Sequence, residues 1–186
     1  SMCRQYEPNF STMQCYTAQY DDYVFVIIDL DKISDSVLQQ DCSNTSPMFL
    51  RHCVFANYLA KYPQYKAALF IEADCAVFNY KIRFENFLKA DSDMTMSIRF
   101  HNGEITAGIY VVRNVAFVQN FLKKWSTTNF VHNADNGALH RLILDLTGYT
   151  LSCQSNNSYE AFMKCFHQTI AKSKCKHGIF SKIVFQ

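Results

Sequence analysis

The chain has 186 residues, of which 49% are hydrophobic and 15% aromatic, with five Gly and three Pro. This composition excludes a disordered or low-complexity protein and suits one domain with its own core. The formal charge of +2, with Lys and Arg scattered along the sequence, argues against a partner that is nucleic acid or an anionic membrane. We therefore expect a single domain over residues 1–186 that binds a small neutral or metal-bridged ligand.

Eight cysteines lie at wide spacing, with no C-x-x-C pair and no zinc-ribbon pattern. An even number of this kind favours two to four disulfides and an oxidising compartment, with buried free cysteines in a cytosolic protein as the alternative. Sequons beginning at Asn9, Asn44 and Asn156 point to the same compartment. No stretch approaches the roughly 20 apolar residues of a membrane span, and no signal peptide is visible at the start. We therefore expect a secreted or luminal protein whose leader or anchor has been removed.

In chain order, residues 1–22 are polar and mixed and predict irregular surface or a short helix. Residues 23–28, YVFVII, are too short an apolar run for a helix and are rich in β-branched side chains, which predicts a strand buried on both faces. Ser46 and Pro47 then fit the N-cap and first residue of a helix that Pro63 ends. The core-facing positions of that helix are Phe49, Cys53, Ala56 and Ala60.

The rest of the chain alternates between the two periodicities. Strands are expected at 66–71, 94–98 and 108–112, and helices at 82–90, 118–125, 139–146 and 158–172. The helix at 118–125 has the clearest apolar stripe, with Val118, Phe121, Leu122 and Trp125 at helical spacing. Strands that alternate with helices predict an α/β layered domain with a mainly parallel sheet.

Glu72 and Asp74 directly follow the expected strand at 66–71. Open α/β sheets bind ligands at the carboxyl ends of their strands, and side chains two residues apart in an extended segment point to one side. Mg²⁺ or Mn²⁺ needs only one or two carboxylates when the ligand supplies phosphate oxygens. The pair therefore predicts a metal site, with the polar start of a turn as the alternative interpretation.

Five short segments in a fixed order carry a family resemblance. They are RHCVFANYL at 51–59, FIEADCAVFN at 70–79, GEITAGIYVVRN at 103–114, NADNGALH at 133–140 and NNSYEAFMKC at 156–165. Over about Pro47 to Cys165 the chain resembles the GT-A fold nucleotide-sugar glycosyltransferases, most closely a small nematode-type group related to galactosyl- and mannosyltransferases. The resemblance implies a GT-A-like, Rossmann-like, mainly parallel sheet flanked by helices. It also implies transfer of a hexose from a nucleotide sugar to a glycan acceptor, in the Golgi or ER lumen or outside the cell.

The resemblance further implies a metal cofactor, Mn²⁺ or Mg²⁺, on the diphosphate of the donor. Glu72 and Asp74 match the two acidic positions of the family's D-x-D segment, with Glu in place of the first Asp. A late His completes the ligands in family members, and His177 is the candidate here, with a solvated tail histidine as the alternative. Glu keeps the charge but lengthens the side chain by one methylene, which octahedral Mg²⁺ or Mn²⁺ tolerates poorly.

The same resemblance implies where substrates bind. Asp135 and Asn136 would face the donor sugar or the acceptor and take part in catalysis, with N-capping of a helix as the alternative. His140, one turn further on, would line the cleft. Glu104 would also take part in catalysis, beside the sugar-binding Gly108, with a solvated loop residue as the alternative for Glu104. We expect Asp135 and Asn136 to share one cleft with Glu72 and Asp74.

Three departures from the family favour a rival function. No segment before Tyr23 forms the family's first strand, the first acidic position is Glu, and the tail is short. The alternative function is that of a catalytically degenerate secreted relative, which acts as a carbohydrate- or protein-binding module. In either case we expect a disulfide between Cys153 and Cys165, which bracket a family segment, and a second between Cys42 and Cys53.

Overall fold

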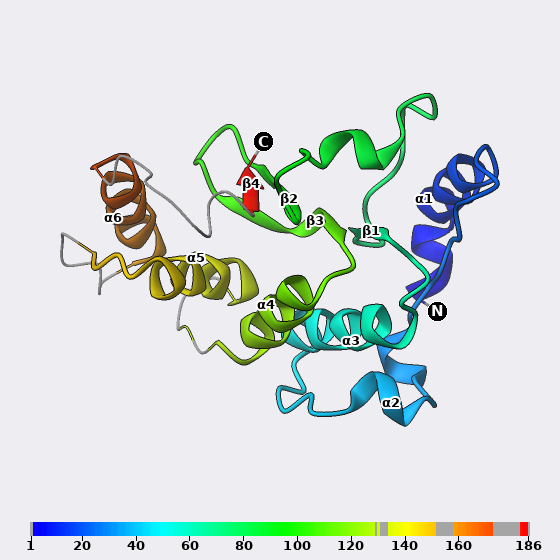
Figure 1. Ribbon diagram of the computed structural model, residues 1–186, viewed down its shortest axis with the longest axis horizontal. Coiled ribbons are helices and arrows are strands. Elements are labelled where there is room, and N and C mark those ends of the chain that lie inside the picture. The colour runs from blue at the N-terminus through cyan, green and yellow to red at the C-terminus, as the bar shows by residue number, and fades with distance from the viewer. Residues whose placement is uncertain (1, 129, 131–133, 152–157, 173–182, 186) are drawn as a thin grey trace.

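The computed structural model describes residues 2–128, 130, 134–151, 158–172 and 183–185 (Figure 1). Its helices are α1 Met2–Thr17, α2 Ser36–Gln39, α3 Pro47–Lys61, α4 Ala116–Thr127, α5 Ala134–Thr147 and α6 Tyr159–Lys172, with short 3₁₀ turns η1 Leu30–Lys32 and η2 Phe84–Phe87. Its strands are β1 Ala67–Ile71, β2 Met94–Ile98, β3 Ile105–Arg113 and β4 Ile183–Phe185. Over these described residues, no helix has both the length and the apolar character that crossing a membrane requires.

The sheet has the order β1-β3-β2-β4, with β3 antiparallel to both β1 and β2 and only β4 parallel to its neighbour β2. The predicted mainly parallel, Rossmann-like sheet is therefore wrong. The reason lies between β2 and β3, which are joined by residues 99–104 alone. A parallel connection needs about a dozen residues or more, so a link of this length makes a hairpin.

Residues 23–28 do not form the predicted buried strand. Their backbone has no sheet partner among the described residues, and the side chains of Val24, Val26 and Ile27 are 59%, 43% and 55% exposed. A short apolar run has the composition of a strand whether or not a neighbouring strand is in reach, and here none pairs with it. The predicted helix at 82–90 is also wrong in extent, because only the 3₁₀ turn at 84–87 forms.

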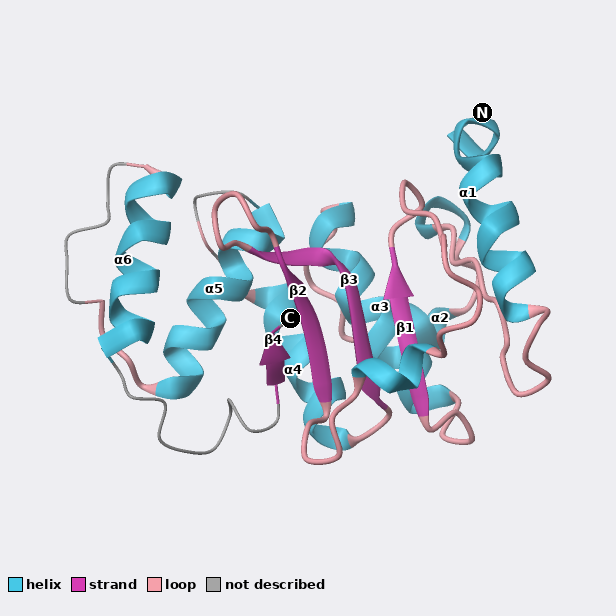
Figure 2. Cartoon of the chain, turned by 90° about the horizontal axis from the view of Figure 1, so that it is seen from above, coloured by secondary structure: helices cyan, strands magenta, loops and turns pink. Residues whose placement is uncertain are grey.

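The core lies between the sheet and helices α3, α4 and α5, and Figure 2 shows α3 and α4 behind the strands and α5 beside them. The predicted stripe of α4 is confirmed, because Val118, Phe121, Leu122 and Trp125 are all buried. Helix α3 begins at Pro47 as predicted, but it is buried almost all round, from His52 to Asn57 and at Leu59. Polar side chains on such a helix must find partners inside the protein, because an unpaired buried polar group costs several kcal/mol.

Helix α1 fixes the loop that follows β1. Three side chains of α1 and one of the turn after it form hydrogen bonds with the loop backbone, at distances of 2.8–3.0 Å. The pairs are Asn9 with Ala73, Thr12 with Val77, Tyr16 with Ile82 and Tyr20 with Tyr80. Figures 1 and 2 both show α1 on the β1 side of the sheet.

The predicted disulfide between Cys42 and Cys53 is confirmed, and it ties the segment before α3 to the buried face of that helix. Cys165 is also disulfide-bonded, but its predicted partner Cys153 lies outside the described residues. Cys15 and Cys75 are free thiols.

Candidate functional site

Most of the predicted site residues meet at one end of the sheet. Because β1 and β2 are both antiparallel to β3, the carboxyl ends of β1 and β2 and the start of β3 lie together. Glu72 follows β1, and its backbone N–H donates to the carbonyl of Gly108 on β3. Asn136 joins α5 to the same strand, because its Oδ1 accepts from the N–H of Ala107 at 2.7 Å.

Arg51 on α3 links the two acidic segments directly. Its guanidinium donates to the carboxylates of Glu72 and Asp135, which lie 21 and 84 residues away in the sequence. The side chains of Arg51 and Asp135 are only 15% and 5% exposed, and the buried Nε of Arg51 has no partner among the described residues. We call Arg51, Glu72, Asp74, Gly108 and Asp135 the sheet-end site.

A buried hydrogen-bond chain supports Asp135 from behind. His52 Nε2 lies 2.9 Å from Asp135 Oδ2, and His52 Nδ1 lies 2.9 Å from the hydroxyl of Tyr110. Burial lowers the pKa of His52 to about 4, so the imidazole is neutral. Its Nε2–H therefore donates to the carboxylate, while Nδ1 accepts from Tyr110. The ring stacks on Trp125 at 3.7 Å between centroids, and Trp125 Nε1 donates to the Asp135 carbonyl.

The charges of the bridge favour the ionised forms of Asp135 and Arg51. Burial alone would raise the pKa of Asp135, but the hydrogen bond from His52 and the charge of Arg51 hold that pKa below its usual value. Burial likewise opposes the charge of Arg51, yet the two carboxylates raise the pKa of the guanidinium overall. One cation thus neutralises one of two carboxylates, and the bridge carries a net charge of about −1.

Glu72 and Asp74 do not share an extended segment as predicted. The N–H of Cys75 donates to the Glu72 carbonyl at 3.1 Å, which closes a turn immediately after β1. Asp74 is exposed, whereas Glu72 lies over Gly108. A Cβ at residue 108 would overlap the Glu72 carboxylate, so glycine is what lets that carboxylate reach Arg51.

No cluster of three or more His, Cys, Asp or Glu side chains able to hold a metal occurs within the described part of the chain. The predicted third ligand, His177, lies outside the described residues. At the sheet end, the available donors are the exposed carboxylate of Asp74 and the carboxylate of Glu72, which Arg51 already contacts. This set is too small for a metal cage made of protein alone, but one or two carboxylates suffice when a ligand brings phosphate oxygens.

Asn136 and His140 hold α5 against β3. Besides the bond from Ala107 to Asn136, His140 Nε2 accepts from the N–H of Ile105 at 3.1 Å, and Nδ1 donates to the Asn136 carbonyl at 2.7 Å. His140 is fully buried, and burial lowers its pKa to about 4. Neither Asp135 nor Asn136 makes the side-chain bond of an N-cap among the described contacts, because their oxygens are directed at α3 and β3.

Glu104 is buried, with 1% exposure, so the alternative of a solvated loop residue is wrong. Its carboxylate accepts from Arg99 in the same hairpin and from the Tyr159 hydroxyl on α6, each at 2.6 Å. Glu104 therefore ties the β2–β3 hairpin to α6 at the same end of the sheet.

Four residues that position Asp135 were not predicted from the sequence to have a role in the site, namely Arg51, His52, Tyr110 and Trp125. The available signal was the Arg51-His52 pair at the start of a segment that is otherwise largely apolar. A charged and a titratable residue on a buried helix require partners, but their identity depends on contacts across the fold.

A separate hollow of about 450 Å³ opens between the segment before α3 and the end of α4. Its lining is neutral and consists of Ser43, Asn44, Thr45, Phe49, Thr127, Thr128 and Phe130. None of these side chains belongs to the sheet-end site, so the hollow and the buried charges are distinct features.

Comparison with known proteins gives a family but no activity. A search of curated proteins finds no match. A family model described as "Protein of unknown function, DUF273" matches residues 13–182, which is most of the chain. The chain therefore belongs to the DUF273 family.

Proposed function

We propose that this protein is a glycosyltransferase-like protein that binds a nucleotide sugar at the sheet-end site and transfers its hexose to a glycan acceptor. The observation that carries the proposal is the Arg51 bridge, which brings the carboxylates of Glu72 and Asp135 together from distant parts of the chain. Carboxylates held in fixed positions accept hydrogen bonds from sugar hydroxyls, and a fixed negative charge stabilises positive charge that develops at a sugar carbon.

The proposal does not depend on a parallel sheet. What it needs is a strand end that delivers a carboxylate and a neighbouring strand without a side chain, and β1 and Gly108 meet that need. Asp135 supplies the second carboxylate from the first turn of α5, where Arg51 and His52 fix its orientation. Preorganised groups of this kind need little rearrangement when a ligand binds.

A divalent ion, Mn²⁺ or Mg²⁺, fits the donor set only as part of a complex with the donor diphosphate. Asp74 is exposed and would hold such an ion, whereas Glu72 would do so in competition with Arg51. When bound, the ion would offset the charge of the leaving nucleoside diphosphate. The rest of the site acts through the positions of its own side chains.

We place this activity in the Golgi or ER lumen or outside the cell. The support is the Cys42–Cys53 disulfide together with the second disulfide at Cys165, because such bonds are rare in proteins of the cytosol.

The second candidate is a binding module without transfer activity. One observation favours it: Arg51 already pairs with both Glu72 and Asp135, which leaves Asp74 as the carboxylate of the sheet-end site without a cationic partner among the described residues. Asp135 in particular is a weak base, because the hydrogen bond from His52 and the charge of Arg51 hold its pKa below the usual value. Such a protein would hold a sugar but would release no nucleotide.

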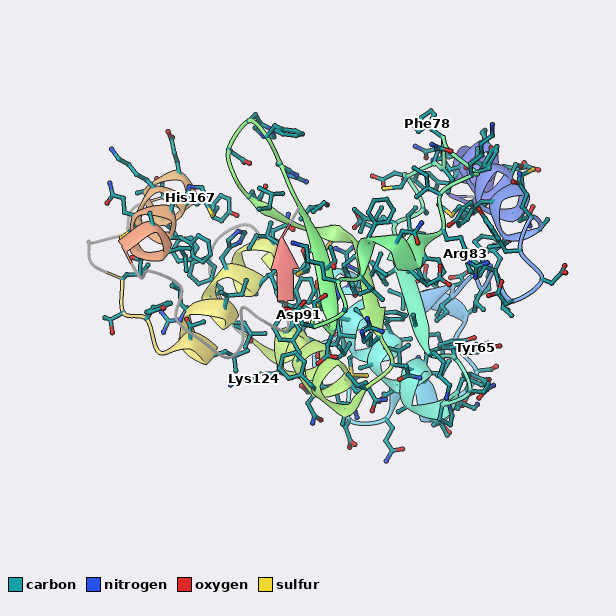
Figure 3. All side chains as sticks on the ribbon, turned by 45° about the horizontal axis from the view of Figure 1, so that its top comes forward. Tyr65, Phe78, Arg83, Asp91, Lys124 and His167 are labelled. Atoms are coloured by element: carbon teal, nitrogen blue, oxygen red, sulfur yellow. A yellow bond between two sulfur atoms is a disulfide. The ribbon has the colours of Figure 1, made fainter. Side chains whose placement is uncertain are left out.

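The decisive experiment is a thermal-shift screen of nucleoside diphosphate hexoses, each with and without Mn²⁺. A ligand that binds only the native state raises the melting temperature. We expect a shift that is larger with Mn²⁺, and we expect Asp74→Asn to remove the metal-dependent part. Asp91→Asn is the matched control, since Asp91 is also an exposed aspartate but precedes β2 at the opposite end of the sheet (Figure 3).

Each nucleotide sugar that raises the melting temperature is then incubated with the protein and with mannose- or galactose-terminated oligosaccharides. The released nucleoside diphosphate is measured. Release above the rate of the Asp135→Asn variant supports transfer, whereas binding without release supports the module. The absence of any nucleotide-sugar shift, with or without Mn²⁺, would contradict both the donor and the site.

A further inference from the structure

Two phenylalanines at the same end of the sheet are almost completely exposed. Phe78, in the loop after β1, is 94% exposed, and Phe100, in the β2–β3 hairpin, is 107% exposed relative to its reference state. Because β1 and β2 run in the same direction, both loops leave the sheet at the end that carries the sheet-end site. Burying a phenylalanine side chain is worth about 1.5–3 kcal/mol, so two rings left in water at the same end of the sheet point to a binding surface.

The exposure of Phe78 follows from a braced loop. Hydrogen bonds from α1 hold Ala73 and Val77 on one side of Phe78, and the Tyr20 hydroxyl bonds the carbonyl of Tyr80 on the other. Figure 3 shows Phe78 at the rim of the molecule beside α1, with its ring directed away from the ribbon. The loop is thus fixed by its backbone while the ring stays outside.

The hairpin that carries Phe100 is braced in the same way. The N–H of Arg99 donates to the Glu104 carbonyl, and the N–H of Gly103 donates to the Arg99 carbonyl, both at 2.8 Å. Gly103 has a φ of +67°, which suits glycine, and its carbonyl lies 3.0 Å from His167 Nε2 on α6. The hairpin is therefore anchored at its base, and Phe100 projects from it.

Each exposed ring is followed by exposed polar side chains. Asn79 follows Phe78, and His101 and Asn102 follow Phe100. The Oδ1 atoms of both asparagines accept backbone N–H groups, which orients their side-chain NH₂ groups. The NH₂ group of Asn102 also donates to Glu104 Oε2 at 3.5 Å, which leaves one of its two hydrogens for a ligand. An aromatic face with an amide donor beside it matches a sugar ring, which presents an apolar face of C–H groups and a rim of hydroxyls.

We propose that Phe78 and Phe100 form an oligosaccharide-binding platform, which receives the acceptor glycan beside the sheet-end site. The two loops diverge from the sheet (Figure 1), so the ligand that touches both is a chain of several sugars rather than one monosaccharide. As an acceptor site the platform rests on the proposed function, but its binding of a glycan is measurable without a nucleotide sugar.

The test uses an array of mannose- and galactose-terminated oligosaccharides, probed with the full chain in the absence of nucleotide. We expect Phe78→Ala and Phe100→Ala each to weaken the binding of a retained glycan about three- to tenfold, and the double variant to lose it. Phe87→Ala is the matched control, because Phe87 is 44% exposed yet lies near Thr95 in the first half of β2, away from the hairpin end. Phe78→Ala and Phe100→Ala should leave the melting temperature unchanged, since these two rings are in solvent, whereas Phe87→Ala should lower it slightly because its ring is half-buried.

Three outcomes overturn the platform: no oligosaccharide binds, the phenylalanine variants bind as the wild type does, or Phe87→Ala is equally impaired. Vesicles of anionic phospholipid are tested in parallel, and vesicle binding that needs both rings, without glycan binding, would assign the surface to a membrane instead. The proposed function fails separately: if glycans bind through the two rings but no nucleotide sugar shifts the melting temperature, the platform stands and transfer does not.

Discussion

Two arginines in this protein each bridge a pair of carboxylates, one inside the fold and one at its surface. Arg51 joins Glu72 to Asp135 with 15% of its side chain exposed. Arg83 has 37% of its side chain exposed and contacts Asp22, Glu85 and the rings of Tyr20 and Tyr23. The two bridges have similar connectivity, so the main difference between them is access to water.

That difference decides what each bridge contributes. Water can replace either partner of Arg83, so its ion pairs are screened and add little to stability. Water has little access to Arg51 and Asp135, so loss of the guanidinium would leave two carboxylates facing each other, one of them buried. A buried ion pair adds little net stability to a protein, but removal of one of its partners is strongly destabilising. The Arg51 bridge fixes the positions of the Glu72 and Asp135 carboxylates. The Arg83 cluster instead holds the chain after α1 against the loop at 80–85.

The largest expected effect comes from Arg51→Met. Removal of the guanidinium leaves Glu72 and Asp135 without a cation, which should lower the free energy of unfolding by about 3–5 kcal/mol. Urea denaturation followed by circular dichroism measures this. The stability of Arg51→Lys should lie between those of the wild type and Arg51→Met, because lysine keeps the charge but cannot bind both carboxylates with a planar fork. A loss no larger than that of a surface variant would contradict the assignment of the bridge to the interior.

The second largest effect is expected from acid, because two buried neutral histidines, His52 and His140, must take up protons as the pH falls. Burial lowers the pKa of His52 and of His140 to about 4, against about 6.5 in the unfolded chain. The unfolded state therefore takes up protons first as the pH falls. The stability that the neutral rings contribute is complete above about pH 6.5 and is lost progressively down to about pH 4, by up to about 3 kcal/mol per histidine. Melting temperature as a function of pH measures the loss, and His140→Gln should reduce its slope.

Gly108→Ala tests whether Glu72 must lie across β3 to reach Arg51. The added Cβ overlaps the Glu72 carboxylate, so the side chain must move or the strands must separate. We expect a loss of about 1–3 kcal/mol, as for overpacked sites. The double variant Gly108→Ala with Glu72→Ala should recover part of that loss. Additive losses in the double variant would show that the clash is not with Glu72.

The smallest effect is expected for Arg83→Ala. Its ion pairs are at the surface, so the melting temperature should fall only slightly, and high salt should reduce the difference from the wild type. The remaining effect, if measured at high salt, reports the packing of the guanidinium on Tyr20 and Tyr23. A salt-independent loss as large as that of Arg51→Met would remove the contrast between the two bridges.

The sequence predicted the parts of this fold that depend on local pattern. The stripe from Val118 to Trp125 and the helix after Pro47 were correct because helical spacing and Pro at the first position act within a few residues. The direction of the strands was wrong, although the short link at 99–104 contained the information needed to predict a hairpin. The unpaired run at 23–28 was wrong for another reason, because composition does not state whether a partner strand is in reach.

The candidate site divides in the same way. The position of Glu72 at a strand end was predictable, because strand ends follow from apolar runs. Its meeting with Asp135 was expected because both segments should end at one edge of the sheet, whereas the connection through Arg51 was not expected. Contacts over 21 and 84 residues are set by how α3 and α5 pack on the sheet, which no local pattern encodes.

The exposed run at 23–28 has a consequence for how the chain survives proteolysis. An extended, unpaired segment fits a protease cleft without unfolding the rest, so elastase should cut here first. The fragment that contains α1 should stay bound without a covalent link, because Asn9, Thr12 and Tyr16 still form hydrogen bonds with the loop after β1. A nicked protein would then migrate as one species in gel filtration and as two fragments in a denaturing gel, so the chain would behave as a two-piece assembly.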